Sequence, residues 1–357
     1  MVYLFVLMFC SAYLYSVEEY RARTLIFIPP FLVYFLIAAL QFNVGSDYPS
    51  YIYIYENQWI LDRYFNTGEY FFYYSNIILE QFKFKPQSIF FVFAFVQSIF
   101  IFVYLKMFSR RGGKVWLIFV IFFCAASVYN NQLNGIRQYA VICLVPIFSL
   151  VLFEKRYFLV ISLLVFASTL HTSYFILFSL PLLLFIYKKF NIGMVTAFIL
   201  SLPLYVLISN LTVPILELLE LRYLSYIDSD YFSEGKLSVI LTKVYYIPLI
   251  LLFYFIYSED RLNSLPSRVR PYVNFCIFIF SCTYWSFITL LDIALLARIA
   301  SYFWLFLIFP IYVVCMYLSK RNIFLFGLVL CYIAFPYIAK VTFLAKNEYL
   351  YNSFIFN

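Results

Sequence analysis

Charged residues are scarce in this sequence: they make up 12% of its 357 residues, whereas 65% are hydrophobic. A soluble domain of this length needs roughly a quarter of its residues charged to cover its surface. The deficit runs along the whole chain, which shows no internal repeat and no low-complexity tail. The composition therefore excludes a soluble protein and predicts one whose main solvent is lipid. No nucleic-acid partner is expected.

The chain also lacks clustered metal ligands. It has one histidine and seven cysteines, and the cysteines lie inside apolar runs, where a free thiol behaves as a small hydrophobe. Without a CxxC motif or a Cys/His cluster, we expect neither a metal site nor another cofactor.

No basic residue precedes Arg21 and no small-residue cleavage site follows the first apolar run. That run is therefore expected to be a retained span rather than a signal peptide.

Apolar runs are what the sequence has in abundance. A spanning helix needs about 20 predominantly apolar residues. Runs of this kind fall near 2–17, 24–42, 87–107, 115–130, 136–153, 157–171, 173–187, 192–213, 238–257, 271–290, 298–318 and 322–341. They predict an all-α integral membrane protein of about 12 transmembrane helices, with residues 1–357 forming a single polytopic domain. Two longer polar and aromatic stretches, 43–86 and 214–237, are expected to be large loops.

Short basic loops favour the cytoplasmic side of a membrane. Placing the clustered basic loops inside collects most of the 25 basic residues and few of the 17 acidic ones there, with both termini outside. One alternative stays open, because 157–187 could be one long helix, which would reverse the topology after it. The two-span interpretation keeps every clustered basic loop inside. Under it, Asp47, Arg137, His171, the 214–237 loop and Arg298 collect at the outer face, where membrane-edge charges usually face a cavity or a partner.

His171 is the only histidine and lies midway in an apolar run, among Ser168, Thr169, Thr172 and Ser173. A neutral imidazole takes up a proton near pH 7, and a sugar hydroxyl that attacks an anomeric carbon must lose one. The alternative is a structural histidine bonded to a neighbouring hydroxyl or carbonyl group. Short half-helices on either side indicate a re-entrant dip into a cavity, which favours the catalytic interpretation.

Arg137 lies in the amide-rich segment 130–138, directly before a predicted span. Asn131, Asn134 and Gln138 are spaced to share one helical face. A guanidinium is always charged and matches phosphate oxygens with two parallel hydrogen bonds. The segment therefore predicts a polar cradle for a substrate, although an interfacial arginine at a helix start is the simpler alternative.

Arg298 follows Asp292 by six residues, so the two share no face of one helix and pair only if the chain bends between them. Arg298 is either a membrane-edge anchor or a second clamp for a diphosphate.

Asp47 follows Gly45 and precedes Pro49, a turn signal just past the second span. Its carboxylate can orient a sugar hydroxyl, support an arginine, act as a base, or cap a short helix over residues 51–60.

Asp228-Ser229-Asp230 has the DxD spacing that holds a metal in enzymes using nucleotide sugars. In an outer loop, where nucleotide sugars are absent, a solvated turn is the better interpretation. The neighbouring Arg222, Tyr223 and Tyr226 are better candidates for saccharide contacts.

Four short motifs, in this order, resemble those of the EpsG/Wzy-type polysaccharide polymerases. They are Gly45-Ser46-Asp47-Tyr48-xx-Tyr51, Asn134-xx-Arg137-Gln138-x-Ala140, His171-x-Ser173 and Arg298-xxx-Tyr302. The resemblance implies a GT-C-like glycosyltransferase of the bacterial inner membrane, with its active site on the periplasmic face. Such an enzyme moves a growing O-antigen or exopolysaccharide chain from undecaprenyl diphosphate onto the non-reducing end of another lipid-linked repeat unit. A chain-length regulator is a candidate partner.

The family's functional arginines and outer-face acid correspond to Arg137, Arg298 and Asp47. The two arginines are expected to clamp the diphosphate, since fixed cations must meet the charge of the leaving group. His171 or Asp47 is expected to serve as the base. Candidate saccharide contacts are Tyr51, Asn134, Gln138, Arg222, Tyr223, Tyr226 and Tyr302. A flippase for lipid-linked oligosaccharides is the main alternative, although its charges are expected throughout a central cavity rather than on one face. An O-antigen-type ligase differs only in the acceptor.

Overall fold

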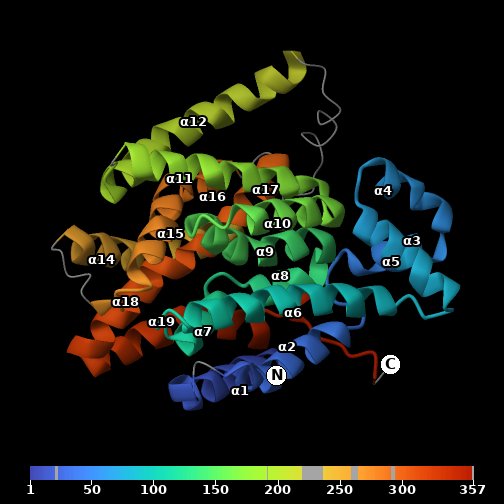
Figure 1. The fold of residues 1–357 in the computed structure, drawn as a ribbon, viewed down its shortest axis with the longest axis horizontal. Coiled ribbons are helices and arrows are strands. Elements are labelled where there is room, and N and C mark those ends of the chain that lie inside the picture. Colours follow the sequence, from blue (N-terminus) through green and yellow to red (C-terminus); the bar gives the residue numbers. More distant parts are fainter. Residues whose placement is uncertain (21–22, 191, 219–235, 259–263, 291–293, 356–357) are drawn as a thin grey trace. The chain divides into compact units, whose positions relative to one another are not determined.

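The structure is a computed structural model that describes residues 1–20, 23–190, 192–218, 236–258, 264–290 and 294–355. Within these ranges the chain is helical and contains no strand beyond one isolated β-bridge. The helices divide into two compact units (Figure 1). The first contains Met1–Leu177 and Cys331–Asn357, and the second contains Phe178–Leu330.

Long apolar helices build the first unit. α6 packs against both α2 and α9, α10 packs against α9, and α1 packs against α7. The contacts are made by large apolar side chains, and almost every residue of α9 is buried. The bounds are α1 Val2–Ser16, α2 Ile28–Ala39, α6 Ser88–Ser109, α7 Val115–Cys124, α8 Val128–Asn134, α9 Ile136–Phe153 and α10 Tyr157–Leu170.

The number of spans that the structure supports is smaller than the predicted 12. Among the described residues, eight helices are long and apolar enough to cross a membrane, and there are nine if the bent pair α7 and α8 counts as one span. That pair bends by 54° because Ser127 adopts a left-handed conformation between the two helices. The other three predicted runs form shorter apolar helices, Val2–Ser16, Thr24–Ala39 and Tyr157–Leu170. The stretch 157–187 is not one long helix, because the extended backbone of His171 interrupts it.

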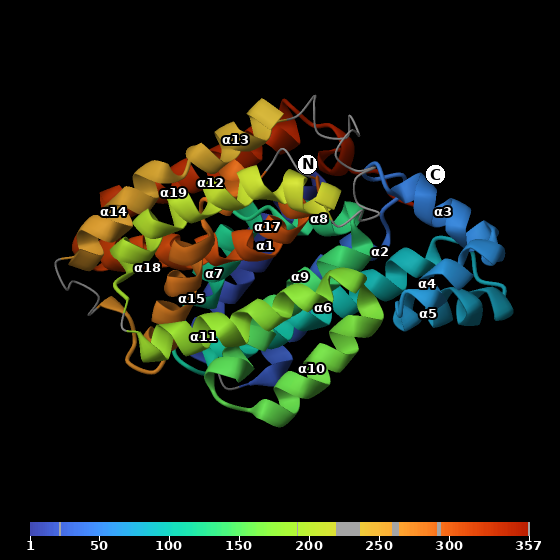
Figure 2. The same ribbon diagram turned by 90° about the horizontal axis from the view of Figure 1, so that it is seen from above.

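The predicted loop 43–86 is largely helical. It contains α3 Tyr48–Glu56, a 3-10 turn Gln58–Ile60, α4 Asp62–Asn66 and α5 Tyr70–Gln81. Both ribbon views show α3, α4 and α5 grouped at one end of the first unit (Figures 1 and 2). Aromatic rings hold this group together and to α6: Tyr48 stacks on Phe90 of α6 at 4.4 Å, and Tyr64 of α4 meets Phe72 of α5 edge-on at 4.9 Å. Aromatic residues make up 24% of the sequence, and part of them therefore serves packing.

The C-terminal segment anchors itself to the start of the first unit. Phe42 donates its backbone N–H to Asn352, and Phe354 donates to Leu40. The carbonyl of Glu348 accepts hydrogen bonds from the Tyr3 hydroxyl and from Asn130 Nδ2. These bonds tie residues more than 200 positions apart and fix the amide-rich α8 from one side.

The second unit packs α15 against α11 and α12, and α14 against α18. Its elements are α11 Ser179–Lys189, α12 Met194–Leu218, α13 Lys236–Val244, α14 Ile247–Ser258, α15 Arg270–Thr283, α16 Ser286–Thr289, α17 Ala294–Trp304, α18 Ile308–Arg321 and the first part of α19 Ile323–Thr342. α12 continues into the predicted loop 214–237, so the loop begins later than the sequence indicated. The rest of that loop up to residue 235 lies outside the described residues.

Candidate functional site

A buried carboxylate that the sequence analysis did not single out organises the polar cluster of the first unit. Glu69 stands at the N-terminal cap of α5, and its side chain is only 4% exposed. Gly68 before it has φ +82°, a left-handed conformation that suits glycine and turns the chain from α4 into α5. The Glu69 backbone N–H donates to the Tyr64 carbonyl at 2.9 Å, which fixes the turn. The carboxylate therefore enters the unit from a well-defined position.

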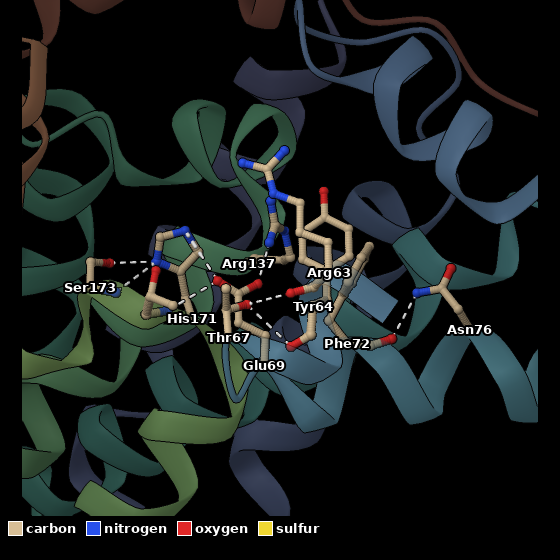
Figure 3. A network of polar contacts seen from close by, with 10 residues as sticks. Arg63, Tyr64, Thr67, Glu69, Phe72, Asn76, Arg137, His171 and Ser173 are labelled. Carbon is tan, nitrogen blue, oxygen red and sulfur yellow. Dashed lines mark hydrogen bonds and ion pairs between the residues drawn. The ribbon is translucent and has the colours of Figure 1, made fainter. Parts of the chain in front are cut away.

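Arg137 pairs with this carboxylate. It lies in the first turn of α9, and its Nη1 forms an ion pair with Glu69 Oε2 (Figure 3). Three aromatic rings surround the guanidinium, with centroids 5.7 Å away at Tyr51, 4.6 Å at Tyr64 and 4.9 Å at Phe72. Cations are attracted to ring faces at such distances. The arginine that the sequence predicted to bind phosphate is thus held on several sides before any ligand arrives.

His171 meets the same carboxylate from another helix. α10 ends at Leu170, and the backbone of His171, the next residue, is extended. Thr172 donates its N–H to Glu69 Oε1 at 3.1 Å, and His171 Nε2 lies 4.0 Å from the same oxygen. Figure 3 shows Glu69 next to both His171 and Arg137. We call Glu69, Arg137 and His171 the Glu69 cluster.

The charges of the Glu69 cluster largely cancel. A buried carboxylate and a buried guanidinium each cost several kcal/mol to desolvate, roughly, and the pair offsets this cost by mutual attraction. Arg137 Nε is nevertheless buried without a hydrogen-bond partner among the residues that the structure describes. A buried donor usually has a partner. The cluster therefore offers an N–H to an incoming acceptor, but little net positive charge.

Asp47 lies in a turn docked onto Asn134. Asn134 Oδ1 accepts the Asp47 backbone N–H at 2.8 Å and lies 3.4 Å from Ser46 Oγ. Asp47 occupies the N-terminal cap of α3, but its side chain makes no capping bond there. Burial raises the pKa of Tyr51, one turn further along α3; the Arg137 charge opposes this rise and Asp47 adds to it. Asp47 is thus linked through Tyr51 to the surroundings of Arg137.

The expectation of one amide-lined helical face over Asn131, Asn134 and Gln138 is wrong. α8 ends at Asn134 and α9 begins at Ile136, so the three residues do not share one helix. The most buried amides of the segment serve packing: Asn130 accepts from the Tyr337 hydroxyl, and Gln132 accepts from the Tyr34 hydroxyl. Gln138, half-buried in the first turn of α9, stays a predicted saccharide contact.

The other predicted site residues belong to the second unit or lie outside the described ranges. Arg298 is exposed on α17, where its carbonyl accepts a bond from Ser301, and Tyr302 is buried one turn later. Their roles stay predictions. Asp292 and the residues proposed for saccharide contact in the 214–237 loop, Arg222, Tyr223 and Tyr226, lie outside the described residues, as does Asp228-Ser229-Asp230.

Comparison with known proteins gives one match: the EpsG family matches residues 24–353, which include every residue of the Glu69 cluster. No curated protein and no solved structure matches the chain.

Proposed function

The chain belongs to the EpsG family of polysaccharide polymerases, and we propose that it joins lipid-linked oligosaccharide repeat units into a polysaccharide. In this reaction the growing glycan leaves undecaprenyl diphosphate and moves to the non-reducing end of another lipid-linked unit. The enzyme is then a membrane glycosyltransferase that builds O-antigen or exopolysaccharide. The observation that carries the proposal is the Glu69 cluster, a buried polar site at the ends of apolar helices.

The position of the cluster suits a donor that is a lipid. Arg137 begins α9 and His171 directly follows α10, and these two consecutive helices pack against each other. Because a short turn joins the end of α9 to the start of α10, the two residues lie at the same end of the pair. A diphosphate at the membrane surface can approach that end while its lipid tail stays in the bilayer. In the bacterial inner membrane, this end would face the periplasm.

The chemistry needs donors for the leaving group and an acceptor for one proton. The bond between the anomeric carbon and the diphosphate oxygen breaks, a new glycosidic bond forms to the acceptor hydroxyl, and the hydroxyl proton passes to a base. Fixed donors stabilise the charge that develops on the diphosphate. Arg137 supplies its buried N–H, and because Glu69 neutralises Arg137, a second cation is needed, for which Arg298 is the candidate. Asp47 and His171 are the candidate bases.

The glycan made by a deletion strain tests this function. A strain without a polymerase caps its acceptor with single repeat units, whereas loss of a flippase leaves no repeat unit on the acceptor. We expect single capped units in the deletion strain and long chains after complementation with the wild-type gene. Complementation with Glu69→Gln should restore the protein in the membrane but not the long chains. Absence of all capped units in the deletion strain would favour transport.

A further inference from the structure

The imidazole of His171 is held in one orientation by the residue two positions later. The backbone N–H of Ser173 donates to His171 Nδ1 at 3.1 Å, and Ser173 Oγ lies 2.5 Å from the same nitrogen. A backbone amide is always a donor, so Nδ1 must present its lone pair to it. In a neutral imidazole the proton then resides on the other nitrogen, Nε2.

The opposite edge of the ring favours the same tautomer. Nε2 lies 4.0 Å from Glu69 Oε1, and a carboxylate attracts an N–H rather than a lone pair. The same carboxylate pairs with Arg137 and accepts the Thr172 N–H, so it faces the ring with acceptor oxygens. Two contacts, one on each ring nitrogen, therefore favour the tautomer of the neutral His171 ring that carries its proton on Nε2.

This arrangement conflicts with the role of a general base. An imidazole accepts a proton through its lone pair, and in His171 that lone pair points at the Ser173 amide rather than toward the Glu69 cluster. Protonating Nδ1 would place two N–H groups against each other and break the Ser173 contact. The nitrogen that faces the cluster can only donate.

Building on the proposed function, we propose that His171 acts as a hydrogen-bond donor to the donor substrate through Nε2–H, and that Asp47 takes the acceptor's proton. The ligand that suits this site is an oxyanion of the diphosphate, which would receive Nε2–H from His171 and Nε–H from Arg137. Glu69 and Ser173 are positioning residues: they set the tautomer and direction of the ring without touching substrate.

The tautomer can be measured directly, because His171 is the only histidine in the chain. Protein labelled with ¹⁵N-histidine and purified without a polyhistidine tag gives a single imidazole spin system by NMR in nanodiscs at neutral pH. We expect a protonated Nε2 and an unprotonated Nδ1. Ser173→Ala retains the backbone N–H and should keep this pattern, whereas Glu69→Gln should weaken it. A protonated Nδ1, or the rapidly exchanging mixture of free histidine, would overturn the inference.

Activity variants test the donor role. Glutamine donates an N–H but takes up no proton, so His171→Gln should keep polymerisation within about tenfold of wild type, the worth of one weakened hydrogen bond. His171→Ala should fall well below it, and Asp47→Asn should be inactive. A base is worth about 10²–10⁴-fold, so a base role predicts equal loss in the glutamine and alanine variants. Equal loss of polymerisation in the glutamine and alanine variants, at matched protein levels in the membrane, would rule out the donor role. The NMR result stands even if the protein proves not to be a polymerase, so the two failures can be told apart.

Discussion

Glu69 neutralises Arg137 before any substrate arrives, and this limits what the guanidinium can contribute. A lone arginine would attract a diphosphate by charge. Arg137 instead keeps a fixed direction, set by Glu69 and by the rings of Tyr51, Tyr64 and Phe72. Arg137 therefore contributes to the reaction through an N–H that is already oriented, because a donor that needs no reorganisation stabilises developing charge most effectively.

Lysine replacements test whether Arg137 and Arg298 act through the orientation of their N–H donors or through their positive charge alone. Arg137→Lys and Arg298→Lys keep a positive charge but lose the planar fork of donors. We expect each to reduce polymer formation about tenfold or more, which corresponds to roughly 1.4 kcal/mol or above. Polymer length and yield are compared on gels at equal membrane levels of protein. Arg110→Lys, an exposed arginine just past α6, is the matched control and should behave as wild type. Full activity in both test variants would show that neither arginine clamps the diphosphate.

Sequence reasoning identified two of the three residues of the Glu69 cluster. His171 stands out as the only histidine, inside an apolar run, and Arg137 as the basic residue of an amide-rich segment at the start of a predicted span. Glu69 lies in a stretch that already contains other charged residues, so nothing in its type or spacing marks it. Its importance comes from three contacts distant in sequence, with Arg137, His171 and Thr172. Such contacts are set by packing, which periodicity does not encode.

At the scale of elements, breaks in the helices place the functional groups. The sequence predicts apolar helices well, because length and hydropathy fix them. The 54° bend between α7 and α8, the separation of α8 from α9 at Gly135, and the extended His171 after α10 depend on single backbone conformations. Of these, the sequence indicated only the interruption near His171. The missed bend and break explain why the predicted amide face does not exist.

The turn before α3 allows a test of whether a single backbone conformation positions a functional group. Gly45 has φ +81°, and a Cβ added there would lie 2.4 Å from Asn134 Oδ1. Gly45→Ala should therefore strain the backbone and push Asn134 away from the Asp47 amide, at a cost of about 1–2 kcal/mol. We expect a lower unfolding temperature in detergent and reduced polymerisation. Gly327→Ala is the control: it lies within α19 with no atom near the added Cβ, so stability should stay equal or rise. Equal unfolding temperatures of both variants would refute the strain.

At the scale of the whole molecule, α6 is long and apolar enough to place the segments directly before and after it on opposite faces of the membrane. Its 22 residues span about 33 Å at 1.5 Å per residue, which matches a hydrocarbon core of roughly 30 Å. α3, α4 and α5 precede its first residue, and the basic segment from Arg110 follows its last. A crossing by α6 puts these two regions on opposite sides of the membrane. Their assignment to outside and inside rests on the basic loops.

Single cysteines decide this assignment. Five of the seven native cysteines are buried and Cys282 is partly so, and a Cys331→Ser background removes the exposed one. In that background, cysteines at Ser50, exposed on α3, and at Ser229 should react with a membrane-impermeant thiol reagent in cells whose outer membrane is permeabilised. A cysteine at Arg110 should react only after the inner membrane is broken. The reverse pattern would place the Glu69 cluster on the cytoplasmic side. A polymerase of this kind acts on lipid-linked units that have been exported to the outer face, so a cluster on the cytoplasmic side could not take part in the reaction. Reaction of Ser50→Cys and Arg110→Cys from the same side would show that α6 does not cross the membrane.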